Sequence, residues 1–82
     1  MAYNNRGSVY ILQNQFPEAI GDLNAAIALK PDFAEAYANR GIAQMKMGKG
    51  QEGCMDLKKA SDLGFAPAGE FYRQNCLSKW WI

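Results

Sequence analysis

The chain has 82 residues, enough for one small domain, and its 49% hydrophobic and 21% charged residues are the composition of a folded protein, not of a disordered one. Its net charge is +1 with scattered basic residues, so the sequence shows no basic patch for nucleic acid or an anionic membrane. With no histidine and only two cysteines, the usual catalytic and metal-binding constellations are excluded, and we predict a non-enzyme without metal or cofactor.

The first predicted unit covers about residues 1–33 and consists of two helices. Apolar and small residues recur at helical spacing over residues 3–11 and again over residues 19–27. Pro17 suits the first turn of the second helix, and Pro31 ends that helix. The sequence therefore predicts a short helical hairpin.

The second predicted unit covers about residues 34–66, with helices over residues 34–47 and 51–63. Gly64 ends the second of these helices. A fifth helix is predicted over about residues 67–80, where it caps the array. Five short helices with short connections predict a single all-α domain over residues 1–82, an alpha-alpha superhelix of stacked antiparallel helix pairs.

The two units are copies of one another at a period of 34 residues. Eight identities fall in one register, which chance does not explain. The matched residues are Tyr3 with Tyr37, Asn5 with Asn39, Arg6 with Arg40, Gly7 with Gly41, Asp22 with Asp56, Leu23 with Leu57, Ala26 with Ala60, and Leu29 with Leu63.

Two of these repeated features have a predicted packing role. Gly7 and Gly41 lie inside helices, where glycine costs about 1 kcal/mol against alanine, so we expect a neighbouring helix to approach closely there. Small residues on the second helices, Ala19, Ala26 and Ala60, would permit that approach. The repeated charges predict a ladder between helices, with Arg6 paired to Asp22, Arg40 paired to Asp56, and Asn5 and Asn39 assisting.

The residues of the first unit resemble the tetratricopeptide repeat. The matching positions are Tyr3, Arg6, Gly7, Tyr10, Phe16, Ala19, Leu23, Ala26 and Pro31. The second unit departs from the pattern, because Gln44 stands in the place of Tyr10, Gly53 in the place of Ala19 and Gly50 in the place of Phe16. Residues 58–68 also resemble the end of a Sel1-like repeat, which implies the same architecture.

This resemblance implies a non-enzymatic scaffold that binds a peptide or a partner helix in a concave groove lined by the first helices. Helix geometry and the 34-residue period place the candidate groove residues at Asn4, Ser8, Ile11, Ala38, Ile42, Met45, Tyr72 and Lys79, with Cys76 on the same face. An alternative for Ile11 and Met45 is packing against neighbouring helices. The resemblance places the family's clamp for chaperone C-termini at Asn4, Ser8, Ile42, Tyr72 and Cys76. Of these, only Asn4 could hold a carboxylate, and weakly, so we predict no such clamp.

The alternative function is self-association. The apolar C-terminus, Trp80-Trp81-Ile82, would dock onto a second copy, fold back on the last helices, or mark where a longer chain was cut. The glycine-rich run over residues 48–53 is expected to be a loose turn, or else a hinge that exchanges helices between two chains. A remote alternative is nucleic-acid binding through Arg6, Arg40 and Arg73.

The remaining predictions concern the cysteines and the compartment. Cys54 and Cys76 fall in apolar patterns, so we expect buried thiols, with a disulfide or redox role as the alternative. The sequence carries no signal peptide and no apolar run near the ~20 residues of a membrane span, so a cytoplasmic location is the default expectation.

Overall fold

A computed structural model describes residues 2–77, which contain five α-helices followed by a π-helical turn. The elements are α1 (Ala2–Leu12), α2 (Phe16–Leu29), α3 (Ala34–Lys46), α4 (Gly50–Asp62), α5 (Ala66–Tyr72) and η1 (Arg73–Leu77). The prediction of an all-α helical repeat fold is confirmed. Within this part of the chain, no helix has both the length and the apolar character needed to cross a membrane.

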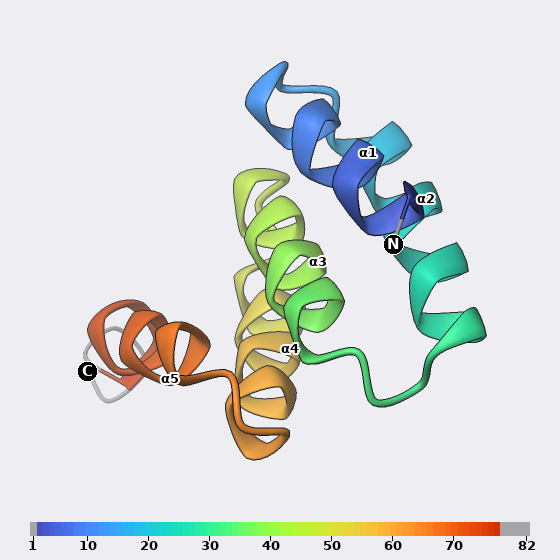
Figure 1. Ribbon diagram of the computed structural model, residues 1–82. Helices are drawn as coiled ribbons and strands as arrows, with labels where there is room; N and C mark the ends of the chain where they lie inside the picture. Colours follow the sequence, from blue (N-terminus) through green and yellow to red (C-terminus); the bar gives the residue numbers. More distant parts are fainter. Residues whose placement is uncertain (1, 78–82) are drawn as a thin grey trace.

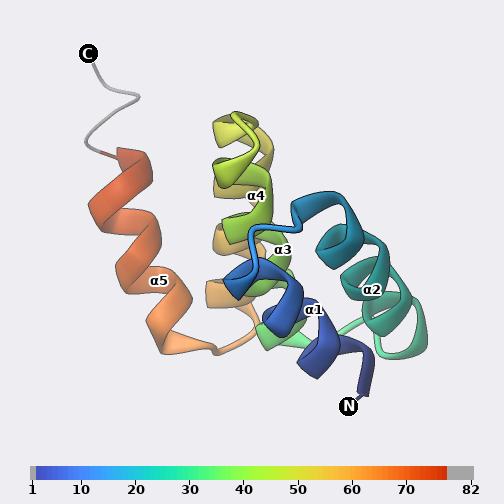
Figure 2. The same cartoon turned by 90° about the horizontal axis from the view of Figure 1, so that it is seen from above.

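The helices are arranged as two pairs and a cap. Figures 1 and 2 show the pair α1–α2 beside the pair α3–α4, with α5 on the far side of the second pair. Between the pairs, α2 packs against α3 and α1 also touches α3, while α5 packs against α4. The first helices of the two pairs are therefore neighbours, as the repeat predicts.

The ends of the helices follow from residues at the turns. Pro17 lies in the first turn of α2, as predicted, and Asn14 adopts a left-handed φ of 61° in the turn before it. Gly48 and Gly64 have φ values of 83° and 102°, a conformation that glycine adopts without steric cost. The predicted fifth helix is α5 up to Tyr72 and then widens into η1. Its predicted last residues, 78–80, lie outside the described part.

The core consists of two clusters, one between α2 and α3 and one among α3, α4, α5 and η1. Leu23 in α2 and Leu57 in α4 are the largest apolar side chains that are fully buried, and they occupy equivalent positions of the repeat. The first cluster comprises Ala19, Leu23, Ala26 and Ala36, and the second comprises Ala38, Cys54, Leu57, Ala60, Ala68 and Cys76. Small residues make up most of both clusters, so the helices pack at short range.

The glycine-rich run over residues 48–53 is not a loose turn throughout, contrary to the prediction. Gly48 lies in the turn, but Gly50 is the first residue of α4 and Gly53 is buried inside that helix. Gly53 faces Gly41 of α3. Gly50 and Gly53 are therefore part of helix α4, and only Gly48 belongs to the turn. The exchange of helices between two chains stays a prediction.

The cysteines correct another expectation. Cys54 and Cys76 are buried, with 7% and 2% exposed, but they are joined by a disulfide and are not free thiols. The turn at residues 63–65 brings α5 and η1 back against α4, so residues that are 22 apart in sequence meet. The spacing alone does not reveal this meeting, because it depends on where the chain turns.

Candidate functional site

The predicted arginine–aspartate ladder joins the two helices of each pair. Arg6 Nε and Nη2 donate to Asp22 Oδ2 and Oδ1 at 2.7 and 2.8 Å. Arg40 Nε and Nη2 donate to Asp56 Oδ2 and Oδ1 at 2.7 and 2.9 Å. Both pairs therefore have the two-pronged geometry in which a planar guanidinium matches a carboxylate best.

The second rung of the ladder has more partners than the first. Arg40 Nη1 also donates to Asn24 Oδ1 of α2 at 3.0 Å, which ties the second helix pair to the first. With its amide nitrogen turned toward the acceptors, Gln44 donates to Asp56 Oδ2 at 2.8 Å. The predicted assistance by Asn39 is wrong, because its amide points to α1. Asn5, the other predicted assistant, is exposed.

The ladder shifts the ionisation of its members. The hydrogen bond and the charge of Asp22 raise the pKa of Arg6, and the hydrogen bond from Arg6 lowers the pKa of Asp22 below its ordinary 3.8. Asp56 raises the pKa of Arg40 in the same way. All three groups are thus charged at neutral pH, and the charge of each arginine is balanced by an aspartate of the protein.

A cluster of polar side chains joins α1 to α3, and we call it the seam: Asn4, Ser8, Glu35 and Asn39. Asn39 Nδ2 donates to Asn4 Oδ1 at 3.0 Å and to Ser8 Oγ at 3.1 Å. Asn4 Nδ2 donates to Glu35 Oε1 at 2.6 Å. Asn4 is only 1% exposed, and both polar atoms of its buried amide have a partner within the protein.

The structure separates the candidate groove residues into buried and accessible ones. Asn4 and Ala38 are buried, with 1% and 3% exposed, so neither offers a surface to a ligand. The half-buried candidates are Ser8, Ile11, Ile42, Met45 and Tyr72. Of these, Ile11 packs against the first core cluster and Ile42, Met45 and Tyr72 against the second. Lys79, Trp80, Trp81 and Ile82 lie outside the described residues.

The accessible side of α3 carries a row of residues that the sequence reasoning largely missed. We call this row the α3 stripe: Glu35, Asn39, Ile42 and Lys46. Spacings of four, three and four residues put these side chains on one face of the helix. Glu35 and Lys46 are exposed, while Asn39 and Ile42 are half-buried. Ile42 was a predicted groove residue, and steps of three or four residues from it along the helix lead to the other members of the stripe.

The chemistry that this surface offers is hydrogen bonding, charge and apolar contact. Leu12 of α1, the repeat equivalent of Lys46, adds an apolar side chain that is 84% exposed. Among residues 2–77 there is no group of three or more acidic, cysteine or histidine side chains placed to hold a metal ion.

Similarity to known proteins agrees with this geometry. A family model described as TPR repeat matches residues 7–48. The chain is 41% identical over 63 residues to a FAM10 family protein of Arabidopsis thaliana, covering 77% of this chain and 14% of that protein. It is 37% identical over 75 residues to RNA polymerase II-associated protein 3 of Xenopus laevis, covering 92% and 11%.

The Hsp70-Hsp90 organizing protein of Triticum aestivum is 36% identical over 58 residues, covering 71% of this chain and 10% of that protein. The chain thus spans only 10–14% of the length of these three relatives. No solved structure matches the chain significantly. The repeat period, the paired helices and these similarities agree, and the chain therefore belongs to the tetratricopeptide repeat family, whose members are in general non-enzymatic protein–protein interaction modules.

Proposed function

We propose that the chain binds an extended peptide or a partner helix on the α3 stripe and the adjoining residues of α1. The observation that supports this most is the accessibility of the stripe. The other sides of α3 are occupied, because α2 packs on one and α4 on another, whereas Glu35 and Lys46 remain exposed. A partner would therefore meet α3 on this side.

The composition of the stripe suggests the chemistry of the ligand. From Glu35 to Lys46 the stripe is about 16 Å long at the rise of an α-helix, which matches about five residues of an extended peptide. Glu35 at one end favours a basic residue and Lys46 at the other end favours an acidic one, while Ile42 favours an apolar residue between them. Leu12, at the repeat position of Lys46, offers a further apolar contact on α1. The proposed ligand is a short amphipathic segment.

The charged residues also bear on two other kinds of ligand, nucleic acid and a chaperone C-terminus. Arg6 and Arg40 are bound to Asp22 and Asp56, so the charges of two of the three arginines of the nucleic-acid alternative are already balanced within the protein. Glu35 near the seam would repel a terminal carboxylate, which supports the prediction that the chain holds no chaperone C-terminus. Self-association through residues 80–82 stays a prediction, which the mass of the chain in solution would test.

The experiment is a selection of peptides from a random library on the immobilised chain, followed by titration of the selected peptides. We expect Lys46→Glu and Glu35→Lys each to weaken binding by at least about fivefold, a loss of about 1 kcal/mol. Lys46 is exposed, so Lys46→Glu should fold like the parent. Glu35→Lys also removes the acceptor of the buried Asn4 amide, so its affinity is compared with its thermal unfolding. An acidic peptide with a free C-terminal carboxylate serves as the probe for the clamp and should not bind at micromolar concentration.

A matched control is available on α4. Met55 is 68% exposed and belongs to a helix that does not carry the stripe, so Met55→Glu should leave the affinity unchanged. The proposal fails if the selected peptides bind the two stripe variants as tightly as the parent chain, or if Met55→Glu weakens them equally. Thermal unfolding of each variant, measured alongside, separates lost binding from lost folding.

A further inference from the structure

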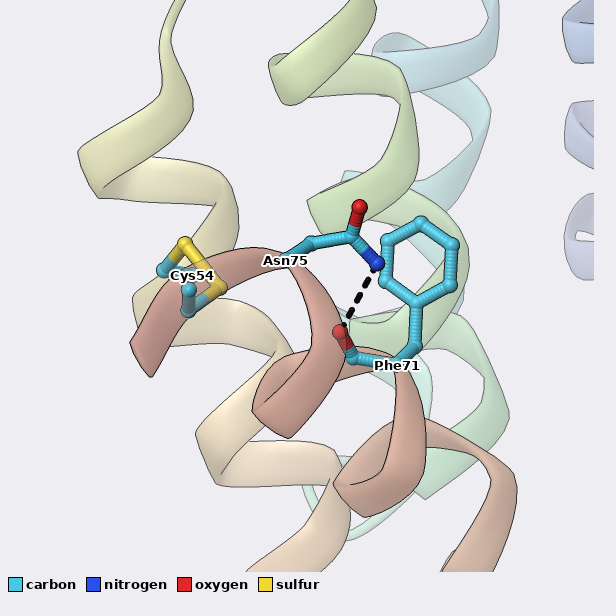
Figure 3. The surroundings of a disulfide bond; sticks show 4 residues. Cys54, Phe71 and Asn75 are labelled. Carbon is cyan, nitrogen blue, oxygen red and sulfur yellow. Dashed lines mark hydrogen bonds between the residues drawn. A yellow bond between two sulfur atoms is a disulfide. The ribbon is translucent and has the colours of Figure 1, made fainter. Parts of the chain in front are cut away.

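The Cys54–Cys76 disulfide fastens the end of the described chain to the second helix pair. Cys54 lies near the start of α4, and Cys76 lies in η1. The chain between them includes the rest of α4, the turn at residues 63–65 and α5. Figure 3 shows the bond between the two segments, with Phe71 and Asn75 beside it.

The segment 66–77 covers an apolar surface. Ala68 and Cys76 belong to the same buried cluster as Ala38 of α3 and Leu57 of α4, and Phe71 packs against this cluster. Without the segment, the apolar side chains of α3 and α4 in this cluster would face water, which is unfavourable. The segment therefore acts as a cover for the second helix pair.

The cover is too short to be stable on its own. Its α-helix has seven residues and its π-helical turn has five, whereas an isolated helix below about 12–15 residues is marginal in water. Asn75 Nδ2 in η1 donates to the Phe71 carbonyl in α5 at 3.0 Å, a bond that stays inside the segment. The order of the segment thus depends on its contact with α4, and the disulfide limits how far it can move away.

We propose that this disulfide is a redox-controlled clasp: the bond keeps segment 66–77 over the apolar surface of α3 and α4, and reduction by a dithiol uncovers that surface. One thiolate of the reductant attacks one sulfur of the bond, forms a mixed disulfide and releases the other cysteine as a thiolate. The second thiol of the reductant then displaces the first cysteine. Two electrons pass to the protein, which gains two thiols after protonation, and the reductant becomes a disulfide.

Because both cysteines are buried, the disulfide can be reduced only after segment 66–77 has moved. With 7% and 2% of the residues exposed, a dithiol reaches the sulfur atoms only when the segment moves away from α4. Reduction should therefore be slow in the closed form. After reduction, the segment is held by packing alone, so it should open more often. The clasp does not require a ligand on the α3 stripe, although Ile42 of that stripe packs against the same cluster.

The test is hydrogen–deuterium exchange of the whole chain, oxidised and then reduced with dithiothreitol. We expect amides of residues 66–77 to exchange at least about tenfold faster after reduction, and amides of α1 and α2 to keep their rates. Binding of a hydrophobic dye should rise in parallel. The double variant Cys54→Ala/Cys76→Ala should show the fast exchange with and without dithiothreitol, which controls for other effects of the reductant.

Three results would overturn the proposal. The first is unchanged exchange of residues 66–77 in the reduced chain, which would mean that packing alone holds the cover. The second is faster exchange throughout the chain, which would make the bond a staple of the whole fold rather than a local clasp. The third is two alkylatable thiols after equilibration with oxidised glutathione, which would show that the bond does not form.

Discussion

Gly41 and Gly53 face each other where α3 packs on α4, with no room for a side chain on either residue. A Cβ atom on Gly41 would lie 2.7 Å from the carbonyl oxygen of Gly53, and one on Gly53 would lie 2.5 Å from the carbonyl oxygen of Gly41. Both obstacles are backbone atoms, which cannot rotate away. The two helices of the second pair are therefore closer at this position than side chains would allow.

This contact predicts a ranking of three glycine-to-alanine variants. Gly41→Ala should lower the free energy of unfolding by about 1–3 kcal/mol, because the added methyl group forces α3 and α4 apart. Gly21→Ala should raise it by about 0.5–1 kcal/mol, because open space surrounds that position of α2 and alanine favours the helix. Gly7→Ala should fall between them, since its Cβ would lie 2.9 Å from the Leu23 side chain.

Urea denaturation of the three variants measures this order. A Gly41→Ala variant as stable as the parent chain would contradict the close contact between α3 and α4. A Gly21→Ala variant less stable than the parent would show that the exposed face of α2 has a role that its open surroundings do not explain.

The ladder predicts unequal losses from equivalent substitutions. Arg40→Met should destabilise the fold by about 1–3 kcal/mol, because it leaves the mostly buried Asp56 carboxylate without its charged partner. Arg6→Met should cost less, since the Arg6 side chain is 60% exposed against 23% for Arg40, and water can replace it. Thermal unfolding of both variants tests the difference, and equal losses would contradict it.

The lowered pKa of Asp22 predicts a dependence of stability on pH. Because the folded-state pKa lies below the ordinary 3.8, the ionised carboxylate stabilises the fold above about pH 4. This contribution is lost as the pH falls through the lower, folded-state value. In urea denaturation at pH 5 and pH 3, the parent chain should therefore lose more stability than Asp22→Asn does. The same loss in both proteins would mean that Asp22 is not the group responsible.

The sequence predicts the ladder and not the seam, for a physical reason. Arg6, Arg40 and their partners recur at the 34-residue period, and opposite charges that share a period on paired helices have an obvious partner. Asn4 has no repeat equivalent, because Ala38 occupies the corresponding position. A comparison of the two units therefore does not mark Asn4 as a residue with a partner. Its partners depend on how far α1 is rotated against α3, which one sequence does not determine.

The accessible surface was harder to predict than the fold for a related reason. Periodicity finds the positions that pack, and Leu23 and Leu57 are buried as expected. It does not show how exposed each of the other faces is. Ala38 and Ile42 are one helical turn apart, but Ala38 is buried against α4 and α5 whereas Ile42 is half-buried. Similarly, the spacing of Cys54 and Cys76 says nothing of the turn that brings them together.

The seam predicts energetic coupling between the two helix pairs. Asn39→Ala removes the donor to Asn4 Oδ1 and to Ser8 Oγ, and should cost about 1–3 kcal/mol because it leaves the buried Asn4 oxygen unpaired. Asn4→Ala removes the other partner. In the double variant the two losses should not add, and the coupling energy should be about 0.5–3 kcal/mol. Urea denaturation of the parent chain, the two single variants and the double variant measures this cycle.

In a helical repeat, stability is a sum of the units and of the interfaces between neighbours. The seam is part of such an interface, so its loss should also make the two helix pairs unfold less cooperatively. Probes in α1 and in α4 of the double variant should then report separate transitions, whereas in the parent chain the two transitions should coincide. Additive losses together with coincident transitions would mean that packing of α2 against α3, and not the seam, joins the pairs.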